Sequence, residues 1–205
     1  MTPRKNDPTG MRDRILDGAA ALFQVHGYAG TTTQRVAEAA GVTHGAMHHH
    51  FSSKKALGLA VIAERISVAV CQTWVDPLAF APTAQEGVAG IFERISRQLD
   101  VNGQVLGCPL NNLALELSVL DADFRREIGA IFHEWRMALA RRLRTDQADG
   151  RGPMGDADAL ATFIVAAYSG AMALSKADQS SSALRVTAQQ LQEVLGNSAR
   201  RQRTA

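Results

Sequence analysis

The sequence predicts an all-α fold of about nine helices, and three observations point to it. Apolar residues recur every three or four positions along most of the 205-residue chain, which is the spacing of amphipathic helices. Glycine, proline and short polar stretches separate these segments. No alternating apolar and polar run exceeds a few residues, and no internal repeat is present. We therefore expect helices packed on helices, without a sheet.

Composition favours a soluble protein with a substantial core. Hydrophobic residues make up 46% of the chain, as in an ordinary globular protein. No stretch approaches the roughly 20 uninterrupted apolar residues of a membrane span, and the start MTPRKNDPTG lacks the apolar core of a signal peptide. Two cysteines, Cys71 and Cys108, do not make a disulfide framework. We expect a cytoplasmic protein that does not associate with membranes.

The first helix is expected from Arg12 to His26, and Gly27 ends it. Its apolar residues fall on one face, which consists of Ile15, Ala19, Leu22 and Phe23. We expect this face to pack behind the segment that follows. The small core formed there would consist of Phe23, Tyr28, Val36, Met47 and Phe51.

Two short helices joined by a tight turn are predicted in the stretch TTTQRVAEAAGVTHGAMHHHFSSKK, residues 31–55. Thr32 or Thr33 can cap the first and Thr43 the second, because a hydroxyl satisfies the free N–H groups of an opening turn. Gly41 permits the left-handed backbone that ends a helix. Small residues, a glycine turn and a polar-faced second helix are what a helix-turn-helix needs to enter a major groove.

Charge is distributed unevenly, although the net charge of the chain is only +2. Residues 1–60 carry seven lysines and arginines against four aspartates and glutamates, together with five of the six histidines. The basic part is therefore the part with the helix-turn-helix, as neutralisation of DNA phosphates requires.

The order TT-x-x-V-A-x-A-A-G-V-T-x-G-A-M-x-x-H-F-x-x-K-x-x-L resembles the N-terminal domain of the TetR family of transcriptional repressors, AcrR-like members included. The resemblance covers about residues 12–61, roughly a quarter of the chain. It implies a three-helix DNA-binding domain followed by a larger helical domain that binds a small molecule and forms a homodimer. Two reading heads of such a dimer bind a near-palindromic double-stranded DNA operator.

The candidate DNA contacts lie on the two short helices and just after them. Small residues let backbone and methyl groups approach the DNA, and an amide such as that of Gln34 can pair with adenine. The family pattern implies that Thr33, Gln34 and Thr43 contact the backbone or a base edge, and that Lys54 contacts a phosphate. The full set is Thr33, Gln34, Thr43, His44, Gly45, Ala46, His48, His50 and Lys54. His48 stands where the family usually has tyrosine, and an imidazole can make a similar contact.

The run His48-His49-His50 does not predict a metal site. Successive helical residues point about 100° apart, so three in a row cannot share one ion. His44 and His48 are spaced to face the same side of a helix, but no third ligand is near in sequence. We expect no metal and no cofactor; imidazoles on a DNA-facing surface could make binding sensitive to pH near 6–7.

The rest of the chain predicts six further helical segments. Ser53 can cap a helix to about Trp74, and Asp76-Pro77 and Pro82 break the chain. Thr83-Ala-Gln-Glu86 is a capping box that opens a helix to about Val101. The remaining helices are expected at about 109–120, 121 or 123 to 144, 156–174 and 180–196, with a polar loop at 145–155.

The stretch Gly107-Cys-Pro-Leu-Asn-Asn-Leu-Ala-Leu-Glu-Leu117 resembles a G-C-x-x-x-N-x-A-x-E-L pattern in a subset of the family's regulatory domains. In some of those regulators the cysteine senses electrophiles or oxidants. Cys108 precedes a helix start, where amides lower a thiol pKa; the alternative is a buried small hydrophobe. No cationic neighbour in sequence supports a depressed pKa.

Apolar and aromatic surface in the second half predicts a pocket for an apolar or mixed small molecule. The candidate ligand residues are Trp74, Phe92, Cys108, Asn112, Glu116, His133, Trp135 and Tyr168. The alternative for each aromatic is a place in the ordinary core.

We expect a flexible arm at 1–10 with Arg4 and Lys5, a DNA-binding domain at 11–56, a regulatory and dimerisation domain at 57–197, and a flexible basic tail at 198–205. The last two helices are rich in small residues and correspond to the family's dimer interface. Effector binding would move the long helix after Ser53 and lower operator affinity. The alternatives are a redox regulator acting through Cys108, a helical ligand-binding protein, or an enzyme using Cys108 and His133.

Overall fold

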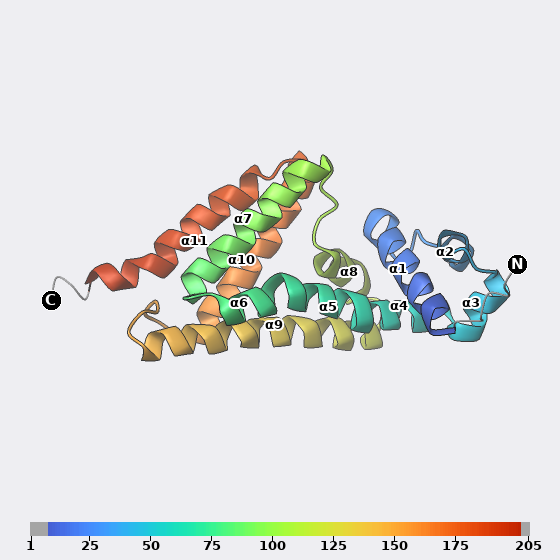
Figure 1. Cartoon of the computed structure of the whole chain (residues 1–205), viewed down its shortest axis with the longest axis horizontal. Coiled ribbons are helices and arrows are strands. Elements are labelled where there is room, and N and C mark those ends of the chain that lie inside the picture. Colours follow the sequence, from blue (N-terminus) through green and yellow to red (C-terminus); the bar gives the residue numbers. More distant parts are fainter. Residues whose placement is uncertain (1–7, 202–205) are drawn as a thin grey trace, which may run out of the picture. The chain divides into compact units, whose positions relative to one another are not determined.

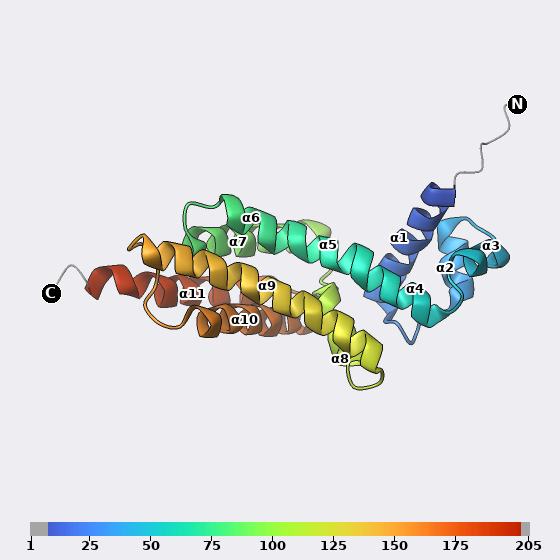
Figure 2. The ribbon, with the colours of Figure 1, turned by 90° about the horizontal axis from the view of Figure 1, so that it is seen from below.

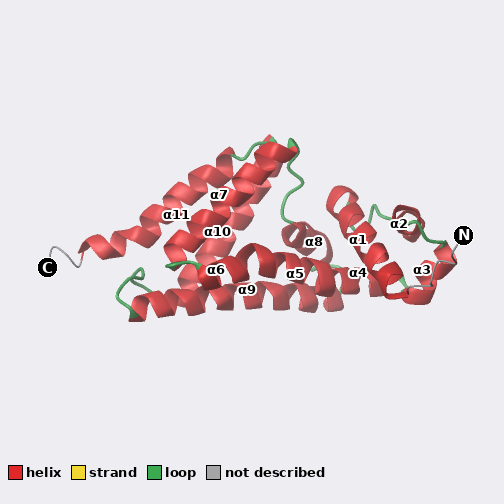
Figure 3. Ribbon diagram, viewed as in Figure 1, coloured by secondary structure: helices red, strands yellow, loops and turns green. Residues whose placement is uncertain are grey.

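The computed structural model of the chain describes residues 8–201, and every regular element in this range is helical (Figure 3). The first three helices are α1 (Pro8–His26), α2 (Thr33–Ala40) and α3 (His44–His50). A continuous helix follows, made of α4 (Lys54–Val61), a π-helical turn (Ile62–Ile66), α5 (Ser67–Val70), a second π-helical turn (Cys71–Val75) and α6 (Asp76–Phe80). The others are α7 (Ala84–Asn102), α8 (Pro109–Leu117), α9 (Ala122–Ala148), α10 (Ala157–Asp178) and α11 (Ser182–Arg201). Counting Lys54–Phe80 as one helix, the described residues form nine, so the predicted all-α fold is confirmed.

The described residues group into two compact units. The first unit combines residues up to Val68 with Pro109–Ile128, and the second combines Ala69–Cys108 with the residues from Gly129 onward. In the first unit α1 packs against α2, α3 and α4 (Figure 1). In the second, α11 packs against both α7 and α10, which lie beside it in Figures 1 and 2. The boundary that we expect at residue 57 stays a prediction, whereas α8 groups with the helix-turn-helix.

The local signals of the first unit form as the sequence predicts. Thr32 caps α2 by accepting a hydrogen bond from the Arg35 N–H, and Thr43 caps α3 by accepting one from the Ala46 N–H. Gly41 ends α2 with φ 64°, in the left-handed region that costs glycine little. Ser53 accepts from the Ala56 N–H and opens α4. These caps fix the residues at which the short helices begin or end.

The predicted break at Asp76-Pro77 is wrong, because the helix that begins at Lys54 runs on to Phe80. The π-helical turn at Cys71–Val75 lies directly before it, and the proline occupies the first turn of α6. A first-turn proline is tolerated because its missing N–H would not be used there. The π-helical turn thus resets the hydrogen-bond register, and the chain continues through a residue that otherwise stops a helix.

Other helix ends also differ from the prediction by a few residues. Helix α1 begins at Pro8 and not at Arg12, and α11 continues to Arg201 beyond Gly196. Helix α9 extends to Ala148, so the loop before α10 is shorter than expected. The rest of the expected arm, with Arg4 and Lys5, and the tail after Arg201 lie outside the described residues.

A buried aspartate joins two helices of the second unit. Asp146 on α9 is 1% exposed, accepts a hydrogen bond from the Ala84 N–H at the start of α7, and lies 3.1 Å from the Arg142 guanidinium. Thr83 caps the same helix end by accepting from the Glu86 N–H, and its hydroxyl donates to the Glu86 carboxylate at 3.2 Å, so the Thr83 half of the predicted capping box is confirmed. Two backbone N–H groups in the first turn of α7, which have no partner within the helix, are thus satisfied by side-chain acceptors: that of Ala84 by Asp146 and that of Glu86 by Thr83.

The loop between α7 and α8 is held by Gln179, which follows α10. Gln179 has φ 50°, the only positive φ of a non-glycine residue among the described residues. Its side-chain amide accepts from the Val105 N–H at 3.1 Å and donates to the Val105 carbonyl at 3.1 Å. One side chain thus satisfies both backbone groups of a residue that has no helix or strand to pair with.

Candidate nucleic-acid interface and ligand-binding region

Helix α3 presents a polar surface and buries one residue. Met47 is 1% exposed and anchors α3 in the core of the first unit, beside the buried Phe51 that follows the helix. Thr43, His44, Gly45 and His48 are exposed, and Ala46 and His50 are half-buried. An additional Cβ on Gly45 would meet no atom within 4 Å, so nothing in the protein itself requires glycine there. The predicted reading face is therefore an available surface of small and imidazole side chains.

Side chains join α2 and α3 across the turn. Thr33 Oγ1 lies 3.0 Å from His44 Nε2, a hydrogen bond whose donor depends on the imidazole tautomer. The rings of His44 and His48 meet edge to face with centroids 4.4 Å apart. Gln34 donates to the Glu38 carboxylate at 2.9 Å on the exposed side of α2. Thr33 and His44 thus form one contiguous patch with His48, and Gln34 must leave Glu38 to pair with a base.

The loop between α1 and α2 is held by a carboxylate from α8. Glu116 accepts hydrogen bonds from the Tyr28 N–H at 2.9 Å and the Ala29 N–H at 2.5 Å. A carboxylate that accepts two backbone N–H bonds makes a strong, charge-assisted contact. The partners are 87 and 88 positions apart in sequence, so no local pattern could have predicted the pair. Glu116, which we expected at the ligand, serves the DNA-binding unit in this structure.

Lys54 is anchored to the same loop. Its ammonium lies 4.4 Å from the centroid of the Tyr28 ring and donates to the Ala29 carbonyl at 3.3 Å. Partial burial lowers the pKa of Lys54, against the opposing effect of Glu116. The expected phosphate contact of Lys54 would therefore come from an ammonium that the loop already positions.

Two groups of ion pairs hold α1 against the long helix, and the sequence did not indicate either of them. Arg12 on α1 forms a bidentate pair with Glu64, both distances 2.6 Å. Arg65 binds Asp13 and Asp17 at 2.8 and 2.6 Å. Since Glu64 and Arg65 lie in the first π-helical turn, α1 is tied to the long helix at two neighbouring residues.

Another pair ties the start of α4 to the start of α9. Lys55 bridges the carboxylates of Asp121 and Asp123, each at 2.7 Å, and these hydrogen bonds lower the pKa of both aspartates. Beside it, the Tyr28 ring packs between Phe23 and Phe124, with centroid distances of 5.3 and 5.1 Å. The first turn of α9 thus contributes to the small core that we expected to come from residues 23–51 alone.

Five of the eight candidate ligand residues lie buried in the second unit. They are Trp74, Phe92, Cys108, Trp135 and Tyr168, each at most 7% exposed. The Trp74 ring lies 4.8 Å from Trp135 and 4.9 Å from Tyr168, measured between centroids. The Trp135 indole N–H is buried and has no hydrogen-bond partner within the described residues. We call these five residues the aromatic cluster.

Two members of this cluster, Cys108 and Trp74, form hydrogen bonds with the Tyr168 hydroxyl. Burial raises the pKa of Tyr168 well above its ordinary 10.0, and the hydrogen bond to Cys108 acts in the same direction, while one from Trp74 opposes it. The hydroxyl therefore stays protonated at neutral pH. Cys108 is buried and packs as a small residue beside it, as the alternative interpretation of this cysteine predicts.

The other three candidates lie elsewhere. His133 is exposed on α9 and does not belong to the buried cluster, and Glu116 binds the loop after α1. Asn112 lies on α8 in the first unit. Helical periodicity identified the aromatic residues, but it could not tell which side of a long helix faces solvent. Within residues 8–201, no three histidine, cysteine, aspartate or glutamate side chains gather as a metal site would require.

Comparison with known proteins agrees with this arrangement. Residues 15–61 match the family described as "Bacterial regulatory proteins, tetR family", and residues 84–190 match "Transcriptional regulator LmrA/YxaF-like, C-terminal domain". The HTH-type transcriptional repressor DhaR of Mycobacterium sp. (strain GP1) is 31% identical over 80% of this chain and 81% of its own length. The HTH-type transcriptional regulator LmrA of Bacillus subtilis (strain 168) is 26% identical over 65% of this chain and 71% of its own.

A solved structure gives the same result for the fold. The crystal structure of a TetR transcriptional regulator from Chloroflexus aurantiacus J-10-FL superposes with a TM-score of 0.80 at 29% identity, covering 90% of this chain and 93% of that one. The similarity thus extends from the helix-turn-helix through the second unit. The chain belongs to the TetR family of bacterial transcriptional regulators.

Proposed function

We propose that this protein is a homodimeric transcriptional repressor that binds a near-palindromic operator and is released from it by a small-molecule effector. The observation that carries the proposal is helix α3, whose polar face is exposed while Met47 anchors it in the core. A short, capped helix held in this way is suited to the major groove. The proposed contacts are Thr33, Gln34, Thr43, His44, Gly45, Ala46, His48, His50 and Lys54.

Exposed apolar side chains on α10 and α11 support dimerisation through these two helices. Large apolar side chains stay exposed there in the single chain: Phe163 and Leu174 on α10 are 49% and 59% exposed, and Val186 and Val194 on α11 are 61% and 44% exposed. Exposed apolar residues gathered along adjacent helices mark an interaction surface. A second copy would bury them, and it would supply the second reading head that a palindrome requires.

The aromatic cluster is the proposed effector site. Its rings supply apolar surface, and the unpartnered Trp135 N–H would gain a hydrogen bond from an acceptor atom on the ligand. We therefore expect an apolar molecule with one or a few acceptors. Trp74 and Trp135 are the only two tryptophans of the chain, so intrinsic fluorescence would report binding.

Two routes can carry the effector signal to the reading heads. The helix Lys54–Phe80 connects the two units through the chain itself. Helix α8 directly follows Cys108 of the cluster, and its Glu116 holds the loop before α2. An effector that prefers one position of these helices would change the spacing of the reading heads by its difference in affinity for the two states.

We infer a cytoplasmic protein, as its role on DNA requires. Helices Lys54–Phe80 and Ala157–Asp178 are long and apolar enough to span a membrane by length and composition, and core helices of soluble proteins have the same properties. Both contain residues that pack inside the two units, such as Leu57 and Ile164. Sensing of oxidants by Cys108 remains an alternative mode of release.

The test is fluorescence anisotropy of the purified protein on DNA from the region upstream of its own gene, with scrambled competitor and a salt titration. We expect tight, competitor-resistant binding by two chains per site, weakening steeply with salt as phosphate contacts release counterions. A matched variant with His44 and His48 both replaced by alanine should lose the specific component. Turnover of a substrate without any DNA binding would contradict the proposal.

A further inference from the structure

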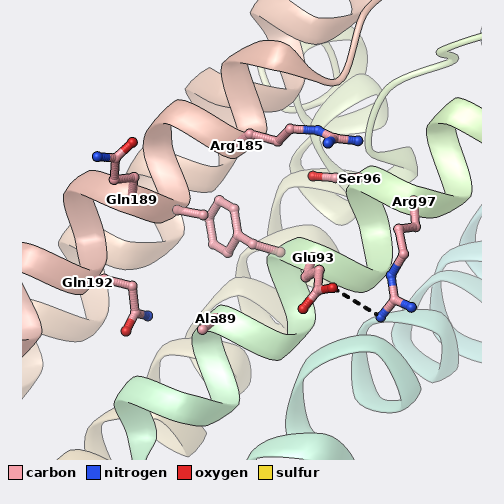
Figure 4. A pocket seen from close by; sticks show the side chains of 9 residues that line it. Ala89, Glu93, Ser96, Arg97, Arg185, Gln189 and Gln192 are labelled. Atoms are coloured by element: carbon pink, nitrogen blue, oxygen red, sulfur yellow. Dashed lines mark ion pairs between the residues drawn. The ribbon is translucent and has the colours of Figure 1, made fainter.

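A pocket of about 410 Å³ lies between α7 and α11, on residues of the second unit that the proposed function does not use apart from Phe92. Its wall on α7 consists of Ala89, Phe92, Glu93, Ser96 and Arg97, and its wall on α11 of Arg185, Ala188, Gln189 and Gln192 (Figure 4). The volume lies in the range of small-molecule sites.

Two sets of contacts join α7 and α11, one at each end of the pocket. At one end the side chains of Gln85 and Gln192 each donate to the other's backbone carbonyl, at 3.3 and 3.0 Å. At the other end Asp100 binds both Ser181, at 2.6 Å, and the Arg185 guanidinium. Two residues with small side chains, Ala89 and Ala188, line the pocket between these contacts.

The two ends of the pocket differ in chemistry. One end carries the Ser96 hydroxyl and the guanidinium groups of Arg185 and Arg97, the latter turned toward Glu93 (Figure 4). The other end carries Ala89 and Gln192. The Phe92 side chain, fully buried, forms the floor with Ala188. A ligand with an apolar body and an anionic head would place both on matching surfaces.

Ser96 points to a ligand independently of this pattern. It is 2% exposed, and its hydroxyl has no hydrogen-bond partner within the described residues. A buried hydroxyl without a partner costs free energy, which an acceptor in the pocket would recover. Arg97 is also available, because its pair with Glu93 spans 3.6 Å between side chains that are each 69% exposed. Such exposed pairs are weak and exchange readily.

We propose that the pocket between α7 and α11 binds a small amphipathic carboxylate, with its head on Arg97, Arg185 and Ser96 and its apolar body along Ala89, Phe92 and Ala188. This pocket is distinct from the proposed effector site, since of the aromatic cluster only Phe92 lines it. Arg185 keeps its link to Asp100, and Arg97 changes partner from Glu93 to the ligand.

The test is isothermal titration calorimetry of the full chain, without DNA, using octanoate as the probe. Butyrate carries the same charge on a shorter chain, and 1-octanol carries the same chain without the charge. We expect saturable binding of one octanoate per chain and at least about tenfold weaker binding of both comparison molecules, because each lacks one of the two matched surfaces.

Two variants locate the binding, and each has a matched control. Arg97→Gln should weaken octanoate about tenfold, whereas Arg141→Gln, at an exposed arginine of α9 outside the pocket, should not. Ala89→Leu should abolish binding by filling the pocket, whereas Gly90→Leu adds bulk at the next residue of α7, where a Cβ meets no atom within 4 Å. Circular dichroism melting checks that all four fold.

Absence of octanoate binding to the wild-type chain would overturn the proposal. So would equal affinity for octanoate and 1-octanol, or binding that persists unchanged in Arg97→Gln and Ala89→Leu. None of these results bears on operator binding, which the anisotropy experiment measures separately.

Discussion

Glycine at position 45 is not required by the fold, but we expect DNA binding to require it. A Cβ at this position meets no atom of the protein, and glycine is a poor helix former. The absence of a side chain therefore has no explanation within the chain itself. Close approach of the backbone to a DNA strand supplies one.

We predict that Gly45→Ala stabilises the protein by up to about 1 kcal/mol, because alanine favours the helix. The same variant should bind the operator at least about tenfold more weakly, since the methyl group would stand between α3 and the DNA. Thermal melting followed by circular dichroism measures the first effect and anisotropy the second. Unchanged affinity would remove Gly45 from the set of contacts.

Glu116 is the second residue whose role can be isolated. Glu116→Ala would leave the Tyr28 and Ala29 N–H groups without their acceptor, which we expect to cost about 1–2 kcal/mol in this half-exposed setting. Hydrogen exchange should accelerate at these two amides first. Glu127→Ala, at a carboxylate that pairs with Arg126 at 3.6 Å, is the control and should leave both amides unchanged.

At the scale of elements, capped helix starts follow from the sequence, whereas several helix ends do not. Thr32, Thr43, Ser53 and Thr83 each cap the helix that they were expected to cap, because a cap depends on residues within one turn. The passage of the helix through Pro77 depends on a π-helical turn, for which the sequence carries no comparable signal. Local rules therefore predicted where helices start better than where they end.

The cap of α3 separates stability from recognition. Thr43→Ala should cost about 1 kcal/mol of stability by removing the acceptor for the Ala46 N–H. Thr43→Asp keeps a good cap, so stability should stay within about 0.5 kcal/mol, while the added negative charge repels DNA phosphate. We expect the aspartate variant to bind the operator more weakly than the alanine variant. If the alanine variant binds the operator more weakly than the aspartate variant, Thr43 does not lie near the phosphates.

At the scale of the whole molecule, the DNA-binding unit is assembled from distant parts of the chain. Periodicity identified the core of α1 through Ile15, Ala19 and Phe23, and a resemblance identified the reading helix. Neither could place α8 and the start of α9 beside them, because the contacts of Glu116 and Lys55 join residues more than 60 positions apart. The sequence thus identified the candidate DNA-contacting residues but not the distant helices that pack against their unit.

Acid should destabilise this assembly through its carboxylates. The hydrogen bond from Arg12 lowers the pKa of Glu64 below its ordinary 4.5, so the unfolded chain takes up the proton first as pH falls. The stabilisation is complete above that value and is lost as pH falls through the folded pKa. Because both side chains are more than a third exposed, Glu64→Gln should cost only about 0.5–1 kcal/mol at pH 7 and should flatten the loss below pH 4.5. Urea unfolding across pH 3–7 measures this, with Glu93→Gln as the control that should change neither.

Assembly into dimers should depend on the outer face of α10. Leu174→Lys places a charge at a side chain that is 59% exposed in the single chain, so the fold should persist while the dimer dissociates. Sedimentation velocity should give a monomer, and operator affinity should fall by a factor of about 100 or more as the second reading head is lost. Leu115→Lys, at an 84% exposed leucine of α8, is the matched control. If the Leu174→Lys protein remains a dimer, the dimer interface does not include this face of α10.

The two hydrogen bonds between the Gln179 side chain and the Val105 backbone restrict which residues can replace Gln179. Its backbone conformation favours glycine or asparagine, but glycine has no amide, and the asparagine side chain is one methylene shorter. Each substitution that relaxes the backbone therefore releases the loop that leads to Cys108. A saturation library selected for repression should retain glutamine at this position, while it accepts many residues at the neighbouring exposed Asp178.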